Sequence, residues 1–253
     1  MDLKEKLRNM INGLEDLFLN NHACICCRKE IPDGTNNFSL CDKCLSEISK
    51  ISGSSCKICG EEVDINVSFC GNCNKDKYYF DKNTSFANYE LVAAKIVKRF
   101  KFYSKKYYAK YIAKLMVENN DVFKDVDYLT FVPISDKRRK ERGFNQAEEI
   151  ANEISKLKNI PVLDLLNKIG DEKHQVGLSQ KERLENLKGS FELIKDNSKF
   201  IKGKNLLIID DVFTTGSTLS ECARVIKSDK INKPKSVCSY TFAKTKLFST
   251  NNG

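Results

Sequence analysis

The sequence has 253 residues, of which 41% are hydrophobic, and a formal net charge of +9. That much apolar material can form a sizeable core, which excludes disorder for most of the chain. No stretch approaches the roughly 20 consecutive apolar residues that span a bilayer, so we expect no membrane insertion. No secretory signal is evident either, so we expect a cytoplasmic protein. The two histidines, His22 and His174, offer little material for a mechanism that rests on a histidine base.

Residues 1–20 form the first predicted element, an amphipathic helix. Leu3, Leu7, Met10 and Leu14 recur at helical intervals, and acidic residues occur throughout the segment. A secretory signal has an uninterrupted apolar centre, so this segment does not resemble one.

A cysteine-rich segment, residues 21–80, follows. Nine of the eleven cysteines lie here, and eight of them form four Cys-x-x-Cys pairs. Four such pairs supply the thiolates for two tetrahedral zinc sites, and a segment without a long apolar periodicity needs metal to fold. We therefore predict a double zinc ribbon with two structural Zn²⁺ ions. The predicted ligands are Cys24, Cys27, Cys41, Cys44, Cys56, Cys59, Cys70 and Cys73.

Other assignments of these cysteines stay open. Disulfides are disfavoured because the cysteine count is odd and no secretory signal is evident. Either Cys26 or His22 could replace a zinc ligand, although only Cys24 and Cys27 have the standard spacing. A site of four thiolates leaves no open coordination position, so we expect a structural or docking role rather than metal catalysis.

Residues 81–126 form a basic helical segment that we expect to pack on the core. Two helices are predicted within it, at 88–102 and 105–120. Residues 95–114 contain eight Lys or Arg and no acid. The residues predicted to face inward are Leu91, Ala94, Ile96, Phe100, Ile112, Leu115 and Met116.

Two interpretations of this basic segment are open. Cations interleaved with rings such as Phe100, Tyr108 and Tyr111 are typical of a surface that binds single-stranded DNA, where Lys or Arg meets the backbone and rings stack on bases. The alternative is an amphipathic helix pair with an aromatic core and solvated lysines. The candidate nucleic-acid residues are Lys98, Arg99, Lys101, Tyr103, Lys105, Lys106 and Tyr107.

Residues 127–246 alternate short aliphatic runs with helical patterns, which is typical of an open parallel α/β sheet. The predicted strands are 128–132, 160–163, 206–209 and 236–243, and the predicted helices are 146–157 and 217–228. Residues 164–203 are polar and punctuated by glycine, so we expect an irregular excursion beside the sheet. The tail, 247–253, is expected to fray.

The most informative string runs from Leu206 to Thr218. A predicted buried strand is followed by two adjacent acids and a Thr-Thr-Gly-Ser-Thr loop that enters a helix. Backbone amides and hydroxyls at a helix N-terminus can surround a phosphate, and carboxylates beside it can bind sugar hydroxyls or hold Mg²⁺ through water. The predicted ligand is therefore a ribose 5-phosphate group. Its predicted binding residues are Asp210, Asp211, Thr214, Thr215, Gly216, Ser217 and Thr218.

A basic loop follows the predicted strand 128–132, at the edge where a doubly wound sheet binds its ligand. Arg138 and Arg142 have the chemistry to bind a pyrophosphate there. Asn145 has a second interpretation, as the cap of the following helix. The neighbouring cations have the alternative of a solvated basic surface.

Several separated parts of the sequence resemble known families. The string 210–218 resembles the phosphoribosyl pyrophosphate (PRPP) binding motif of type I phosphoribosyltransferases. Val132-Pro133-Ile134, then Arg142-Gly143-Phe144-Asn145-Gln146, and later Gly189-Ser190-Phe191 resemble the ComF (ComFC) family of competence-associated proteins. That family also has an N-terminal zinc ribbon region, so the resemblance covers about residues 20–245.

The resemblance implies roles for particular residues. It implies that Asp210 and Asp211 bind the ribose 2- and 3-hydroxyls, that residues 214–218 surround the 5-phosphate, and that Mg²⁺ accompanies PRPP. The residues that it assigns to a pyrophosphate or family motif are Arg138, Arg142, Asn145, Gln146, Gln175, Arg183 and Asn186.

These observations lead to one main hypothesis and two alternatives. The main one is a protein that binds PRPP, or a related ribose 5-phosphate ligand, and assists natural competence and DNA uptake by binding single-stranded DNA. The first alternative is an active Mg²⁺-dependent phosphoribosyltransferase that acts on an unidentified base in nucleotide metabolism. The second is a zinc-ribbon protein adaptor for a competence helicase or DNA-uptake channel.

Overall fold

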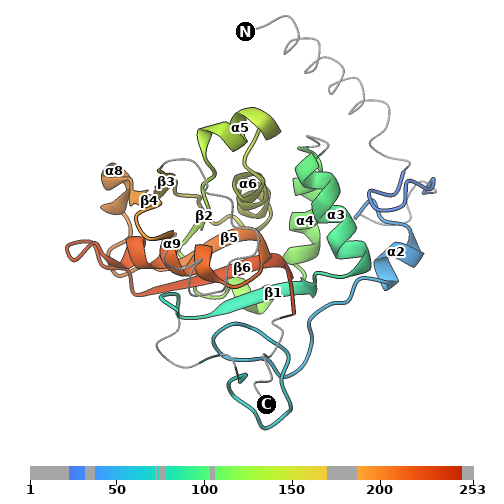
Figure 1. Ribbon diagram of the computed structural model, residues 1–253, viewed down its shortest axis with the longest axis horizontal. Coiled ribbons are helices and arrows are strands. Elements are labelled where there is room, and N and C mark those ends of the chain that lie inside the picture. Colours follow the sequence, from blue (N-terminus) through green and yellow to red (C-terminus); the bar gives the residue numbers. More distant parts are fainter. Residues whose placement is uncertain are drawn as a thin grey trace, which may run out of the picture.

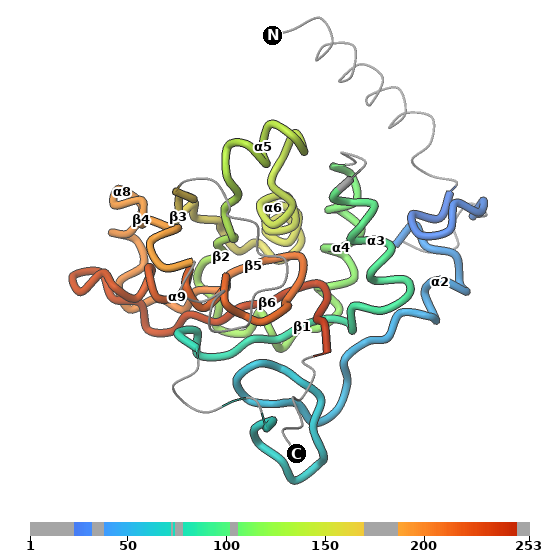
Figure 2. The backbone as a smooth tube through the Cα atoms, viewed as in Figure 1, coloured from blue at the N-terminus to red at the C-terminus, as the bar shows by residue number. Residues whose placement is uncertain are grey.

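The computed structural model of the protein describes residues 23–31, 38–71, 73, 78–102, 106–169 and 187–246 (Figures 1 and 2). Several predictions lie outside the described residues, namely the N-terminal helix, the tail, His22, Tyr103, Lys105, His174, Gln175, Arg183 and Asn186.

The centre of the described chain is a parallel sheet of four strands in the order β1-β6-β5-β2. The strands are β1 (Asn83–Asn88), β2 (Tyr128–Phe131), β5 (Asn205–Phe213) and β6 (Ser236–Lys244). Ile208 pairs with Thr130 on one side and with Ser239 on the other. The predicted fold class, an open parallel α/β sheet, is confirmed.

The middle of the sheet is buried on both faces. Leu206, Leu207, Ile208 and Ile209 are consecutive and all buried, as expected for a parallel strand that is covered on both sides. The prediction that this strand ends at Ile209 is wrong. The pairing continues to Phe213 because β6 runs alongside as far as Lys244, so the two acids belong to the strand itself.

Two predictions about the neighbouring segments also need correction. The predicted strand 160–163 is only an isolated parallel bridge between Val162 and Leu129, and Pro161 beside it has no N–H to donate to a ladder. The predicted irregular excursion contains a short antiparallel pair, β3 (Leu166–Lys168) with β4 (Phe191–Leu193), and a helical turn, α8 (Lys195–Ser198).

Helices cover the sheet. They are α3 (Leu91–Phe102), α4 (Tyr108–Met116), the 3₁₀ turn η1 (Asn120–Phe123), α5 (Asp136–Arg142), α6 (Gln146–Lys158) and α9 (Ser217–Lys227). Ile96, Phe100 and the predicted core residues of α4 are buried. Leu91 is 77% exposed, which contradicts its predicted inward position, because α3 begins there and turns Val92 and Ala93 inward instead. None of the helices in the described ranges has the length and apolar character to cross a membrane.

Two elements are not among the predictions. Strand β1 lies in the segment predicted to be basic and helical, yet it pairs with β6 in the central sheet. Helix α5 has no buried residue, so its sequence has no apolar periodicity that could reveal it. It is instead defined by its ends, where the Ser135 hydroxyl accepts from the Arg138 amide and Gly143 adopts a φ of 83°.

Both cysteine-rich ribbons contact this body directly. The first, which contains α2 (Asp42–Ser46), lies beside α3 and α4, and the Tyr108 hydroxyl donates to the Ile25 carbonyl at 3.0 Å. The ribbon backbone also covers the outer edge of β1. There the amide of Ile51 donates to Phe86 and the amide of Asn83 donates to Ile58. The ribbons therefore cap a sheet edge that would otherwise present unpaired backbone groups.

Candidate phosphate-binding cleft and metal sites

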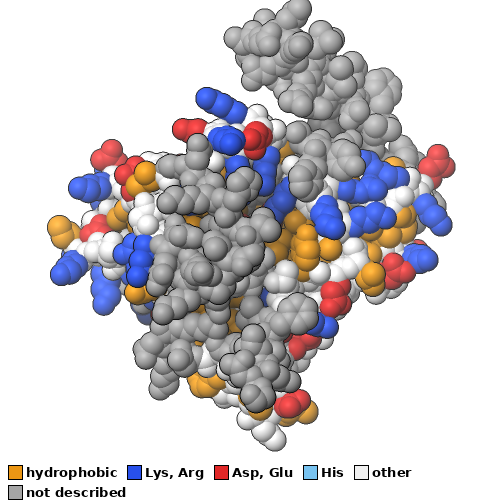
Figure 3. Space-filling model, viewed as in Figure 1, with side chains coloured by type: hydrophobic (Ala, Val, Ile, Leu, Met, Phe, Trp, Pro, Cys, Tyr) orange, Lys and Arg blue, Asp and Glu red, His pale blue; other side chains and the backbone are white. Residues whose placement is uncertain are grey.

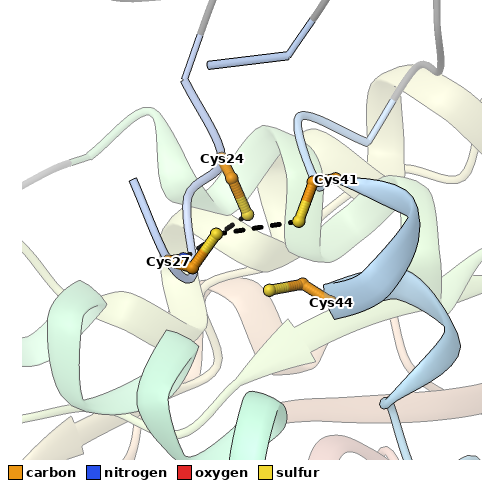
Figure 4. Close-up of side chains that lie close together, drawn as sticks. All are labelled: Cys24, Cys27, Cys41 and Cys44. Carbon is orange, nitrogen blue, oxygen red and sulfur yellow. Dashed lines mark hydrogen bonds between the residues drawn. The ribbon is translucent and has the colours of Figure 1, made fainter. Parts of the chain in front are cut away.

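Each predicted set of four cysteines comes together. Figure 4 shows the side chains of Cys24, Cys27, Cys41 and Cys44 pointing toward one another. The second set is Cys56, Cys59, Cys70 and Cys73. In each set the sulfur atoms lie within 4.8 Å of one another, and one pair of sulfurs per set is 3.6 Å apart. Tetrahedral zinc with bonds of about 2.3 Å separates its sulfurs by about 3.8 Å, so both sets fit a structural zinc ion.

Among the described residues, the cysteines group as these two sets, while the alternative ligand His22 lies outside the described residues. All eleven cysteines are free thiols, which contradicts a disulfide framework. Cys26 is buried, which raises the pKa of its thiol, and it belongs to neither set. In the second set, a hydrogen bond from Cys73 does most to lower the pKa of Cys59 to about 5, and the charge of Lys244 acts in the same direction. The same hydrogen bond raises the pKa of Cys73, so one of the two thiols loses its proton less readily than the other.

The loop between β5 and α9, residues 214–218, has the form of a phosphate cradle, and we call it the phosphate loop. Gly216 in this loop is the N-cap of α9 and has a φ of 76°. A Cβ atom there would lie 2.6 Å from the ring of Phe213. Only glycine fits this position. The Thr215 and Ser217 hydroxyls bond each other at 2.9 Å and brace the loop, whereas Thr214 and Thr218 line the adjacent cleft.

The two acids of β5 border the same cleft. Asp211 is nearly buried, and one of its carboxylate oxygens lies 2.9 Å from Nζ of Lys101 in α3. Lys101, predicted as part of a nucleic-acid surface, therefore has its ammonium group inside the cleft. Burial, followed by the charge of Asp211, raises the pKa of Asp210 to about 7. The carboxyl group of Asp210 therefore ionises less readily than a free aspartate, and a nearby cation or hydrogen-bond donor would favour its ionised form.

Replacing Asp210 with Asn should change how stability depends on pH. The folded pKa of Asp210 lies above its unfolded value, so the wild type loses stability as pH rises toward about 7. We expect the advantage of Asp210→Asn in free energy of unfolding to widen by about 2 kcal/mol between pH 5.5 and pH 8, or roughly 4–8 °C in melting temperature. Thermal unfolding without ligand measures this.

Asp127→Asn is the matched control for that measurement. A hydrogen bond from the Asn205 amide lowers the pKa of Asp127, so this carboxyl is ionised in both states across the same pH range. Its substitution should shift the melting temperature by the same amount at every pH. A constant gap for Asp210→Asn as well would contradict the raised pKa.

Among the predicted pyrophosphate residues, the two arginines line the cleft, whereas Asn145 has a structural role as a helix cap. Arg138 and Arg142 line the cleft with their guanidinium-bearing side chains on α5. Asn145 is 1% exposed and is the cap of α6, since its side chain accepts from the Ala147 amide and donates to the Val132 carbonyl. The capping interpretation of Asn145 is confirmed, although it also borders the cleft.

The side-chain amide of Gln146 is only partly hydrogen-bonded. Its Oε1 accepts from Arg142 at 3.0 Å, while its Nε2 is buried and has no hydrogen-bond partner among the described residues. A buried donor without a partner is costly, and Gln146 is one of the residues that line the cleft.

The cleft has a volume of about 360 Å³ and includes residues that the sequence did not mark as functional. They are Tyr89, Lys168, Leu187, Phe191 and Thr245. They come from elements far apart in the sequence, and only Phe191 lies in a segment that resembles a family motif, Gly189-Ser190-Phe191. Of these residues, Lys168 has the side chain that fits an anionic ligand best, since it adds a further cation to a cleft that already contains two arginines.

The basic helices have an aromatic core. Phe100, Tyr108 and Tyr111 are buried, so these rings are not available to stack on bases, and the amphipathic interpretation holds for them. Tyr107 is partly buried and packs against Tyr108, with ring centroids 5.0 Å apart. Lys106 pairs with Glu149 of α6. The exposed cations that remain near α3 and α4 include Lys95, Lys98 and Lys110, and Figure 3 shows Lys and Arg side chains gathered on the side where α3 lies.

Comparison with known proteins matches both parts of the chain. The phosphoribosyl transferase domain family matches residues 110–250, and the double zinc ribbon domain family matches residues 14–74. Competence protein F of Haemophilus influenzae is 30% identical over 214 residues, which cover 82% of this chain and 91% of that protein. Competence protein ComFC of Bacillus subtilis is 29% identical over 217 residues, covering 81% and 84%. DNA utilization protein YhgH of Escherichia coli is 24% identical over 210 residues, covering 80% and 89%.

Proposed function

Because the chain belongs to the ComF family, in which a double zinc ribbon precedes a phosphoribosyltransferase-type domain, we propose that it binds PRPP with Mg²⁺ and assists natural competence in the cytoplasm by handling single-stranded DNA. The observation that carries the PRPP part is the cleft itself. Thr214 and Thr218 of the phosphate loop, two acids and two arginines all border one cavity of about 360 Å³.

In this proposal each group of residues meets one part of PRPP. The amides of the phosphate loop, with Thr214 and Thr218, bind the 5-phosphate. Asp210 and Asp211 accept hydrogen bonds from the ribose hydroxyls, and the unpartnered Nε2 of Gln146 donates to a ligand oxygen. Bound Mg²⁺ would supply positive charge to the pyrophosphate group.

Lys101 has two partners in turn. In the structure its ammonium group lies 2.9 Å from a carboxylate oxygen of Asp211 and neutralises it. When Asp211 turns to the ribose or to Mg²⁺, the ammonium group becomes available to the phosphates, beside Arg138 and Arg142. The ion pair therefore neutralises Asp211, and in the complex the pyrophosphate takes over the role of Asp211 as the partner of Lys101.

The DNA part of the proposal depends on charge more than on stacking. The relatives include a protein named for DNA utilization and two named for competence. The exposed cations Lys95, Lys98 and Lys110 have the chemistry to meet a nucleic-acid backbone. Among the interleaved rings whose burial is described, Phe100, Tyr108 and Tyr111 are in the core.

Replacing Lys95, Lys98 and Lys110 together with Ala should weaken binding of single-stranded DNA. Each lost phosphate contact lowers the slope of log affinity against log salt by about 0.7, so the triple variant should lose up to about 2 from the slope. Fluorescence anisotropy with a labelled oligonucleotide over a series of salt concentrations measures it.

The control removes three exposed lysines near α8 and the loop after α9, namely Lys195, Lys202 and Lys230. It lowers the net charge equally but should leave the slope close to that of the wild type. If the variant without Lys95, Lys98 and Lys110 binds DNA as the wild type does, these lysines are a solvated surface. The alternative of a zinc-ribbon protein adaptor is then favoured over DNA binding.

A second candidate function is phosphoribosyl transfer to a base. It is favoured by the same cleft, since cations around a pyrophosphate stabilise its departure from the sugar. Incubation with PRPP and Mg²⁺ against a panel of bases, read as release of pyrophosphate, decides between binding alone and transfer.

A further inference from the structure

Tyr78 joins the second zinc ribbon to the phosphate loop. It lies five residues after Cys73, the last ligand of the second set. Its hydroxyl donates to the carbonyl of Thr215 at 3.0 Å. Its ring also lies against Gly216, where an added Cβ would be 2.8 Å from Cε1 of Tyr78. The loop that would bind phosphate therefore rests on a residue of the ribbon side.

The ring of Tyr78 is held in turn by two phenylalanines. It stacks on Phe80 with a centroid distance of 4.7 Å, and both rings meet Phe213 edge to face. We call Tyr78, Phe80 and Phe213 the aromatic clamp. Such packed rings have well-defined positions, so the hydroxyl of Tyr78 is aimed at one place.

The clamp is also tied to the second ribbon and to α9. Lys244 is 2% exposed, and its ammonium group lies 4.1 Å from the ring centre of Phe213. It also forms an ion pair with Glu61, which lies in the second ribbon between Cys59 and Cys70. The amide of Tyr79 donates to the Ser220 hydroxyl in the first turn of α9. The ribbon, the loop and the helix thus share one set of contacts.

We propose that Tyr78 is a positioning residue for the phosphate loop, through which the second zinc ribbon holds the loop amides ready for a phosphate. The proposal rests on the proposed function for the identity of the ligand. In a trans peptide the N–H points opposite to the carbonyl, so a Thr215 carbonyl fastened to Tyr78 directs the Gly216 N–H away from Tyr78. An amide oriented before binding saves the ordering cost at binding.

Tyr78→Phe removes the hydroxyl and keeps the ring. Titration with ribose 5-phosphate, followed by calorimetry, should show affinity up to about fivefold lower than in the wild type, because the loop must then be ordered at binding. Fivefold corresponds to the full energy of one hydrogen bond. The matched control is Tyr108→Phe. It too removes a tyrosine hydroxyl that donates to a backbone carbonyl at 3.0 Å, but that carbonyl belongs to Ile25 of the first ribbon and not to the phosphate loop. The control should bind ribose 5-phosphate with the affinity of the wild type, although its melting temperature should be similar to that of Tyr78→Phe.

Hydrogen exchange provides a readout that needs no ligand. Amides of residues 214–218 should exchange faster in Tyr78→Phe than in the wild type and stay unchanged in Tyr108→Phe. If the wild type binds neither ribose 5-phosphate nor PRPP, the proposed function fails while the exchange data still decide the role of Tyr78. Wild-type exchange and wild-type affinity in Tyr78→Phe, or equal effects in both variants, would overturn the proposal.

Discussion

Zinc analysis of the purified protein should find two equivalents per chain, and removal of the metal should unfold both ribbons. Structural zinc contributes about 10–16 kcal/mol of apparent binding free energy in small domains, which exceeds the stability of most domains. The ribbon backbone also covers the edge of β1, so its loss would leave that edge unpaired. A chelator should therefore lower the melting temperature strongly and promote aggregation.

Cys24→Ala and Cys26→Ala form a matched pair for this prediction. Both cysteines are buried in the first ribbon, but only Cys24 belongs to a set of four. Cys24→Ala should retain one equivalent of zinc, and Cys26→Ala should retain two. One equivalent or fewer in the intact wild type, or a loss of zinc in Cys26→Ala, would contradict the two sites described here.

PRPP with Mg²⁺ should raise the melting temperature of the wild type, and Asp210→Ala combined with Asp211→Ala should abolish the rise. A ligand that binds only the folded state at 100 times its dissociation constant stabilises by about 2.7 kcal/mol, or roughly 5–10 °C for a chain of this size. The double variant removes both carboxylates that border the cleft and leaves Lys101 without its acidic partner.

Asp81→Ala combined with Asp127→Ala is the control for the PRPP experiment. These acids form ion pairs with Lys227 and Lys204 and do not line the cleft. Their loss lowers the starting melting temperature, but the ligand should still raise it by the wild-type amount. An undiminished shift in the Asp210 and Asp211 variant would place the ligand elsewhere.

Features that depend on neighbours in the sequence could be predicted without a structure. The Cys-x-x-Cys pairs set the ligands of both zinc sites, because two residues between cysteines let both sulfurs reach one ion. The string from Leu206 to Thr218 encodes a strand, a loop and a helix in succession, and these are the elements observed. In both cases the residues that cooperate are close along the chain.

The limits of strands and helices depended on partners in space. The pairing of β5 with β6 carries the strand through both acids, although aspartate is a poor strand former. Strand β1 was missed because its pairing partner, β6, is near the other end of the chain. Helix α5 was missed because none of its residues is buried, so burial could leave no pattern.

By itself, the sequence determined which chemical groups this protein has: eight cysteines with the spacing of zinc ligands, a hydroxyl-rich loop that enters a helix, and two adjacent acids. The tertiary structure alone decided which of the other groups join them. It turned Lys101 from the basic helix into the cleft and brought Tyr78 to Thr215, 137 positions away. Side chains on separate elements meet only when the sheet and its helices pack, because no local pattern records a contact between distant parts of a chain.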